Sequence, residues 1–238
     1  VGENGELTTL GRGGSDTTAS ALGVALNAEY IDIFTDVEGV MTADPRIVKD
    51  ARLLDAITYN EICQLAREGA KVVHPRAIEI AMQKSIPLRV RCTFTDSLGT
   101  MVANQMPGTD HRMRIIADRM ITGITYTSNI AQIMINTGNL QEAKGIELKV
   151  FKSLALADIS VDFITVHPES IRFTVNIDQA EKTEEVLNNL DIVPQIERDC
   201  AKVAIVGAAM TGIPGVMSKV VEALTENDIT ILQSGDSY

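Results

Sequence analysis

The stretch "TTLGRGGSDTTASALG", from Thr8 to Gly23, places three glycines, an arginine and an aspartate directly before a helical pattern. A glycine-rich loop that leads into a helix lets backbone N–H groups approach an anion, and the helix dipole adds partial positive charge. Arg12 adds a guanidinium that matches a carboxylate or a phosphate. Asp16 suits the orientation of cations, a metal or an amino group. The alternative is a glycine turn in which Ser15 or Asp16 caps the helix.

The residues around this loop have the pattern of an α/β layered domain. From Thr8 to about Val102, strands rich in β-branched residues alternate with helical stretches. "YIDIFTDV", from Tyr30 to Val37, is nearly continuous apolar sequence, which predicts a strand buried on both faces. Thr35 and Asp36 lie at its carboxyl end, where ligands bind in open α/β sheets.

Local signals predict two helices and a further strand. Thr58 and Glu61 form a capping box, and Gly69 lies near the end of the same helix. Pro75 occupies a plausible first position of the next helix. "IPLRVRCTF", from 86 to 94, alternates apolar and polar residues, which predicts a half-exposed strand with Phe94 on its apolar face.

Composition excludes several classes of function. The net charge of -11 over 238 residues argues against a nucleic-acid partner, because binding to phosphate backbones depends on Lys and Arg. The three cysteines are far apart and form no CxxC pair, so we expect no disulfide framework, no metal site and a reduced, cytoplasmic setting. No apolar run is long enough for a membrane span. None of the three histidines has another metal-binding or catalytic residue at the sequence spacing of a known site: His74, His111 and His167.

The second half of the sequence contains an internal repeat at an offset of 70 residues. The segment 145–159 matches the segment 215–229 at six of fifteen positions. The first copy predicts a βαββαβ unit. The second copy predicts a strand, a helix and a second strand before Tyr238, so we expect it to be incomplete. Glycine, proline and polar residues place a linker between the halves, which gives predicted boundaries of 1–105, 106–118, 119–199 and 200–238.

Three segments together resemble a known family. "TTLGRGGSDTTA" (8–19), "FTDVEGVMTADPR" (34–46) and "EGAKVVHPRA" (68–77) look like signature segments of the C-terminal half of the aspartokinase catalytic domain. The repeats resemble its tandem ACT regulatory domains. The run "AEYIDIFTDVEGVMTADPR" (28–46) is most similar to the monofunctional bacterial type controlled by diaminopimelate.

This resemblance implies a fold and an activity. The fold would be the C-terminal half of an amino acid kinase fold, with a mainly parallel sheet between helices, followed by two ferredoxin-like ACT domains. The activity would be transfer of the γ-phosphoryl group of ATP, with Mg²⁺, to the β-carboxylate of L-aspartate. That reaction is the first step of lysine, diaminopimelate, threonine and methionine biosynthesis.

The resemblance also implies roles for individual residues. The aspartate-binding loop falls on Arg12, Ser15 and Asp16, with Arg12 on a substrate carboxylate. The catalytic positions would be Asp16 and Lys71, since phosphoryl transfer needs positioning and positive charge around the transferred group. The predicted nucleotide-binding residues are Thr35, Asp36, Met41, Arg46, Lys71 and Val72.

For the regulatory half, the resemblance implies an amino acid effector, either lysine, diaminopimelate or threonine, and a homodimer formed through the ACT domains. Glycines at a helix N-terminus suit a carboxylate, and acidic side chains suit an ammonium group. The alternative is that the glycines only permit tight turns. The predicted effector-binding residues are Gly145, Ile146, Glu147, Gly215, Val216, Gln233 and Asp236.

Two further expectations concern the whole protein. The family's N-terminal KxGGxS segment has no counterpart here, so we expect the 238 residues alone to lack kinase activity. An alternative function is an amino-acid-sensing regulatory subunit without kinase activity. A third, a glutamate or acetylglutamate kinase, does not explain the repeat.

Overall fold

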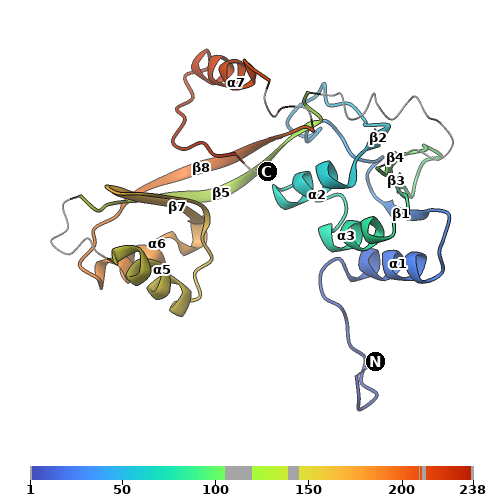
Figure 1. The fold of residues 1–238 in the computed structure, drawn as a ribbon, viewed down its shortest axis with the longest axis horizontal. Coiled ribbons are helices and arrows are strands. Elements are labelled where there is room, and N and C mark those ends of the chain that lie inside the picture. Colours follow the sequence, from blue (N-terminus) through green and yellow to red (C-terminus); the bar gives the residue numbers. More distant parts are fainter. Residues whose placement is uncertain (1, 105–119, 139–144, 209, 211–212, 237–238) are drawn as a thin grey trace. The chain divides into compact units, whose positions relative to one another are not determined.

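A computed structural model describes residues 2–104, 120–138, 145–208, 210 and 213–236 (Figure 1). The predicted linker at 106–118 lies outside these residues. The chain folds into two compact units. Unit 1 comprises residues 1–126 and 203–227, and unit 2 comprises residues 127–202 and 228–238. None of the helices within the described ranges is both long and apolar enough to cross a membrane.

Unit 1 is built around a four-stranded mixed sheet with the order β1-β3-β4-β2. β1 and β3 are parallel, β2 and β4 are parallel, and β3 and β4 are antiparallel. The predicted α/β class is therefore confirmed. The elements of this layer are α1 (Gly14–Ala25), β1 (Ile31–Thr35), β2 (Ala56–Ile57), α2 (Tyr59–Arg67), α3 (Pro75–Gln83), β3 (Leu88–Cys92) and β4 (Thr100–Val102).

One face of the sheet supplies the core of unit 1. Ile31 and Ile33 of β1 lie in register with Leu88 and Val90 of β3, and all four side chains are buried. They share an apolar cluster with buried side chains of α2 and α3. Alternation along each strand puts these residues on one side, so apolar burial on this face fixes the register.

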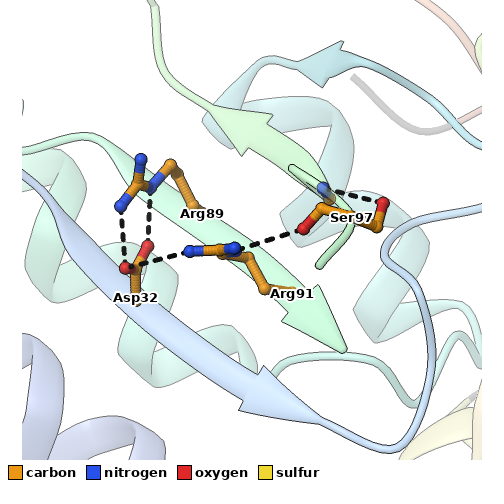
Figure 2. A network of polar contacts seen from close by, with 5 residues as sticks. Asp32, Arg89, Arg91 and Ser97 are labelled. Atoms are coloured by element: carbon orange, nitrogen blue, oxygen red, sulfur yellow. Dashed lines mark hydrogen bonds and ion pairs between the residues drawn. The ribbon is translucent and has the colours of Figure 1, made fainter. Parts of the chain in front are cut away.

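The other face of β1 carries charge (Figure 2). Asp32 accepts hydrogen bonds from Arg89 at 2.6 and 2.7 Å and lies 3.8 Å from the guanidinium of Arg91, which also donates to the Ser97 carbonyl. Phe34 remains 56% exposed. The predicted burial of this strand on both faces is therefore wrong. β1 is an edge strand of the described sheet, and paired charges occupy its second face instead of apolar side chains.

The predicted helix starts are confirmed. Thr58 and Glu61 form the capping box of α2, and Pro75 is the first residue of α3. β3 alternates buried and half-buried residues as expected. Phe94, predicted on the apolar face, is 80% exposed because the strand ends at Cys92.

Unit 2 confirms the βαββαβ prediction for the first repeat. Its sheet has the order β6-β7-β5-β8, and β7 is antiparallel to both β5 and β6. Figure 1 shows α5 and α6 on the same side of this sheet, where they share an apolar core with β5 and β7. The elements are β5 (Gly123–Asn136), α5 (Ile146–Leu156), β6 (Asp162–His167), β7 (Ser170–Asn176), the 3-10 turn η1 (Ile177–Gln179), α6 (Ala180–Asn188) and β8 (Gln195–Val206).

The second repeat departs from its prediction. Its strand is the end of β8 and its helix is α7 (Val216–Thr225), but residues 229–236 form no strand. Side-chain hydrogen bonds, rather than a backbone ladder, join this segment to the sheet: the Leu232 carbonyl accepts from Arg172 at 3.3 Å, and the Gln233 side chain makes three further hydrogen bonds. It donates to the Phe163 carbonyl and to the Thr165 hydroxyl, each at 2.7 Å, and accepts from the Gln132 amide. The predicted second strand is therefore wrong within the described residues.

Tyr59 provides a test of the core of unit 1. Its ring is 1% exposed, its hydroxyl donates to the Ile86 carbonyl at 2.6 Å, and burial raises its pKa to about 12. Because the folded-state pKa lies above the unfolded value of about 10, the neutral phenol stabilises the fold below pH 10. That contribution is lost as the pH rises toward 12, at up to about 1.4 kcal/mol per pH unit.

We therefore expect Tyr59→Phe to lower the free energy of unfolding by about 1 kcal/mol at pH 8. The deficit relative to the natural chain should shrink between pH 10 and pH 12, since phenylalanine does not titrate. Urea unfolding across this pH range measures both effects. A deficit that stays constant to pH 12 would contradict the buried, hydrogen-bonded phenol.

Candidate functional site

The glycine loop before α1 depends on left-handed backbone. Gly11 and Gly13 have φ angles of 78° and 71°, a region that glycine adopts without steric cost. Gly13 is the N-cap of α1 and no side chain caps the helix. The alternative in which Ser15 or Asp16 is the N-cap is therefore wrong. Within the described residues the N–H groups of Ser15 and Asp16 have no acceptor, so they are free to bind an anion.

This loop is held against the start of α3. An Asp16 carboxylate oxygen accepts a hydrogen bond from the His74 N–H at 3.3 Å. A Cβ atom at Gly13 would lie 2.3 Å from the His74 ring, so only glycine permits this approach. The His74 ring nitrogen in turn caps α3 by accepting from the Arg76 N–H. The contact brings Asp16 close to the segment that contains Lys71 and Val72.

His74 is a residue whose position the sequence did not reveal. Its spacing showed no catalytic or metal-binding partner, whereas the structure gives it two structural contacts, one with the glycine loop and one with its own helix. The available signal was its place directly before Pro75, where a capping residue is expected.

The predicted nucleotide residues begin at the end of β1. The Thr35 hydroxyl donates to Asp36 at 3.1 Å, and the Thr93 hydroxyl donates to the Thr35 carbonyl at 3.0 Å. Thr35 is half-buried and Asp36 is exposed. Met41 lies opposite Leu53 in an isolated antiparallel bridge.

Thr100 of β4 holds the segment that follows. Its buried hydroxyl accepts a hydrogen bond from the Val40 N–H at 2.8 Å and donates to the Leu54 carbonyl at 2.6 Å. A Cβ atom at Gly39 would lie 2.6 Å from the same hydroxyl. Sequence reasoning missed Thr100, because these contacts are long-range and leave no local pattern.

The predicted cations have different surroundings. Arg46 forms a two-pronged pair with Asp44 at 2.7 Å and is 84% exposed, and its hydrogen bonds lower the pKa of Asp44. Arg12 and Lys71 are exposed, and within the described residues neither has a hydrogen-bond or ion-pair partner. Val72 packs against the apolar core of unit 1.

The structure therefore brings together only part of the predicted set. Asp16 and Ser15 hydrogen-bond to each other, and Asp16 contacts His74, three residues after Lys71. A depression of about 620 Å³ is lined by residues between Thr8 and Leu22, including Ser15 but neither Arg12 nor Asp16. No contact within the described residues joins Arg46 to this loop.

The predicted effector residues lie at two helix starts and in the C-terminal segment. Gly145 and Gly215 are left-handed N-caps of α5 and α7, with φ angles of 82° and 93°. Ile146 is buried and Glu147 lies in the first turn of α5. Val216 begins α7, Asp236 is exposed, and Gln233 contacts β5 and β6 of unit 2. Among the residues that the structure describes, no cluster of three His, Cys, Asp or Glu side chains could hold a metal ion.

Two parts of the chain match families of known proteins. Residues 1–92 match the amino acid kinase family, and residues 195–238 match an ACT domain. Aspartokinase 1 of Bacillus subtilis is 48% identical over 99% of this chain. The chain is similar to aspartokinases over nearly its whole length. It spans 57% of the length of that relative, so the activity of a whole aspartokinase is a separate question.

Solved structures of aspartokinases share the fold. The aspartate kinase of Clostridium acetobutylicum has a TM-score of 0.84 at 26% identity, covering 99% of this chain and 55% of its own. Escherichia coli aspartokinase III has a TM-score of 0.74 at 31% identity, covering 99% of this chain. It is known in complex with aspartate and ADP (53% of its own chain covered) and with lysine and aspartate (52%).

The two left-handed glycines allow a matched test of the loop. Gly11→Ala meets no atom within 4 Å and pays only for its backbone conformation, about 1 kcal/mol, whereas Gly13→Ala also places a methyl group against the His74 ring. We expect Gly13→Ala to lower the free energy of unfolding by at least about 1 kcal/mol more than Gly11→Ala. Urea unfolding of both variants measures the difference. Equal losses would show that the loop does not lie against His74.

Proposed function

We propose that this chain provides the C-terminal part of an aspartate kinase, which transfers the γ-phosphoryl group of ATP to the β-carboxylate of L-aspartate. An oxygen–phosphorus bond forms at the carboxylate, the bond to the β-phosphate breaks, and ADP leaves. The observation that carries the proposal is the contact between Asp16 and His74, which sets the glycine loop beside the segment that contains Lys71. The complex of Escherichia coli aspartokinase III with aspartate and ADP supports it.

The loop provides groups that suit an acidic amino acid. The guanidinium of Arg12 and the free N–H groups of Ser15 and Asp16 suit a carboxylate, because the helix N-terminus adds positive potential. The Asp16 carboxylate suits the ammonium group. Its two oxygens also accept from Ser15 and His74, which hold its orientation.

The nucleotide side provides positive charge and a strand end. Lys71 is exposed and suits a phosphate, and Thr35 and Asp36 lie where ligands meet parallel strands. Arg46 reaches a phosphate only if it leaves Asp44 or binds through its free N–H groups. Mg²⁺, when bound with the nucleotide, neutralises phosphate charge. It usually takes one or two carboxylates plus phosphate oxygens, for which Asp36 is a fitting ligand here.

We further propose that the ACT half binds an amino acid from the pathway that the reaction starts, either lysine, diaminopimelate or threonine, in a cytoplasmic homodimer. The lysine complex of Escherichia coli aspartokinase III supports an amino acid effector. The helix starts at Gly145 and Gly215 suit the carboxylate of such a ligand. The Gln233 amide nitrogen already donates to β6, so this residue would contact a ligand through the second acceptor position of its oxygen.

A coupled assay of ADP release with aspartate tests the catalytic proposal. We expect no turnover from the 238 residues alone, and turnover when they are joined to the N-terminal segment of Aspartokinase 1 of Bacillus subtilis. In the joined protein, Arg12→Ala should lower kcat/KM for aspartate by about tenfold to a hundredfold, since a charge-assisted hydrogen bond is lost. Arg198→Ala, which removes an exposed arginine of unit 2, is the control and should leave it unchanged.

Three results would contradict the proposal. Turnover by the isolated 238 residues would show that catalysis does not need an N-terminal segment like that of the relative. An active joined protein in which Arg12→Ala and Arg198→Ala behave alike would remove Arg12 from the site. Activity unaffected by lysine, diaminopimelate and threonine, each alone and in pairs, would remove the regulatory part.

A further inference from the structure

A buried carboxylate in α2 has a partner that the capping box does not require. Glu61 is 2% exposed, and one of its oxygens accepts from the Thr58 N–H and hydroxyl at 3.0 and 2.6 Å. Its second oxygen accepts a hydrogen bond from the hydroxyl of Thr122, which is also 2% exposed. A buried carboxylate is expensive unless its oxygens are satisfied, so the Thr122 hydroxyl meets a strong requirement.

Thr122 directly precedes β5, and β5 begins against the predicted nucleotide segment. The Thr122 N–H donates to the Val206 carbonyl, and two residues later the Ile124 N–H donates to the Thr42 carbonyl, both at 2.8 Å. Gly123 lies between them, and a Cβ atom there would lie 3.3 Å from both Leu65 and the Thr42 carbonyl. The start of β5 is therefore packed tightly between α2 and Thr42.

Thr42 organises the segment on which Met41 and Arg46 lie. Its N–H donates to the Arg52 carbonyl at 2.8 Å, and its hydroxyl accepts from the Arg52 N–H at 3.0 Å. The Leu54 N–H donates to the Val40 carbonyl at 2.9 Å. Thr42 thus uses its amide and hydroxyl within the hairpin-like segment 40–54 and its carbonyl on β5.

We propose that Glu61 is a positioning residue for the nucleotide segment. Through Thr122 it fixes the start of β5, and β5 in turn holds the Thr42 carbonyl and with it the backbone between Val40 and Arg46. The description of this segment as nucleotide-binding rests on the proposed function. The contacts from Glu61 to Thr42 do not depend on that function, so an experiment can contradict the positioning role and the nucleotide role separately.

Amide hydrogen exchange in the 238-residue chain tests the positioning. Thr122→Val keeps the shape of the side chain but removes the hydroxyl, which leaves one Glu61 oxygen without its donor. We expect the amides of Ile124, Thr42 and Leu54 to exchange about tenfold to a hundredfold faster, the range for a buried acceptor that loses its partner. The Thr93 N–H donates to the carbonyl of Thr35 at the end of β1, and its exchange rate should not change.

The opposite end of β5 offers a matched control. Thr137 directly follows the strand, is also 2% exposed, and donates through its hydroxyl to the Pro168 carbonyl at 3.0 Å. Thr137→Val removes a buried hydroxyl in the same way and should leave the amides of Thr42 and Leu54 at their natural rates. Thr122→Ser, which keeps the hydroxyl, should do the same. If Thr122→Val does not fold, Thr122→Ala takes its place, because it also removes the hydroxyl from Glu61, and it should accelerate the same amides.

Two results of hydrogen exchange would overturn the proposal. One is unchanged exchange of Thr42 and Leu54 in the variant. The other is a uniform acceleration of all protected amides of unit 1, which would show only a general loss of stability.

Kinetics of the protein joined to the Bacillus N-terminal segment then separate this proposal from the proposed function. Thr122→Val should raise the KM for ATP about tenfold and leave the KM for aspartate unchanged. Equal increases in both constants, or none, would overturn the positioning role while the kinase assignment stands. If the joined protein has no activity, the proposed function fails and the exchange rates alone decide whether Glu61 positions the segment.

Discussion

The close approach of His74 to Gly13 is the constraint on which the rest of the candidate site depends. It requires a residue without a Cβ atom at a left-handed position, and it sets the first turn of α1 against the start of α3. Asp16 then accepts a hydrogen bond from the His74 N–H. This bond fixes the Asp16 carboxylate relative to His74, which lies three residues after Lys71. Ala19 and Val24 of α1 pack against the apolar core of unit 1, so the helix that follows the loop supports the same placement.

Buried hydroxyl and carboxylate groups hold two loops of unit 1 against its apolar core. Thr100 ties the loop after β1 to β4, and Glu61 ties α2 to the residue before β5. Thr100 contacts the predicted nucleotide segment directly, whereas Glu61 is linked to it through Thr122 and the start of β5. β5 begins in unit 1 and continues in unit 2, so the same strand serves the sheet of the ACT half.

The sequence predicted those features that depend on residues close together in the chain. The capping box at Thr58, the helix start at Pro75 and the βαββαβ order of the first repeat follow from spacing and periodicity. The exposed face around Phe34 and the irregular segment 229–236 depend on which neighbours cover a strand, and one sequence does not specify that. Thr100 and Thr122 bind partners 46 to 61 residues away, so no short pattern could reveal them.

The most direct test is a crystal structure of the chain joined to the N-terminal segment of Aspartokinase 1 of Bacillus subtilis, with aspartate and ADP bound. The account predicts an aspartate carboxylate on Arg12 and the N-terminus of α1, its ammonium group at Asp16, and the ADP phosphates beside Lys71. A structure in which Arg12 and Asp16 face away from the bound aspartate, or in which ADP binds away from Thr35 and Lys71, would contradict it.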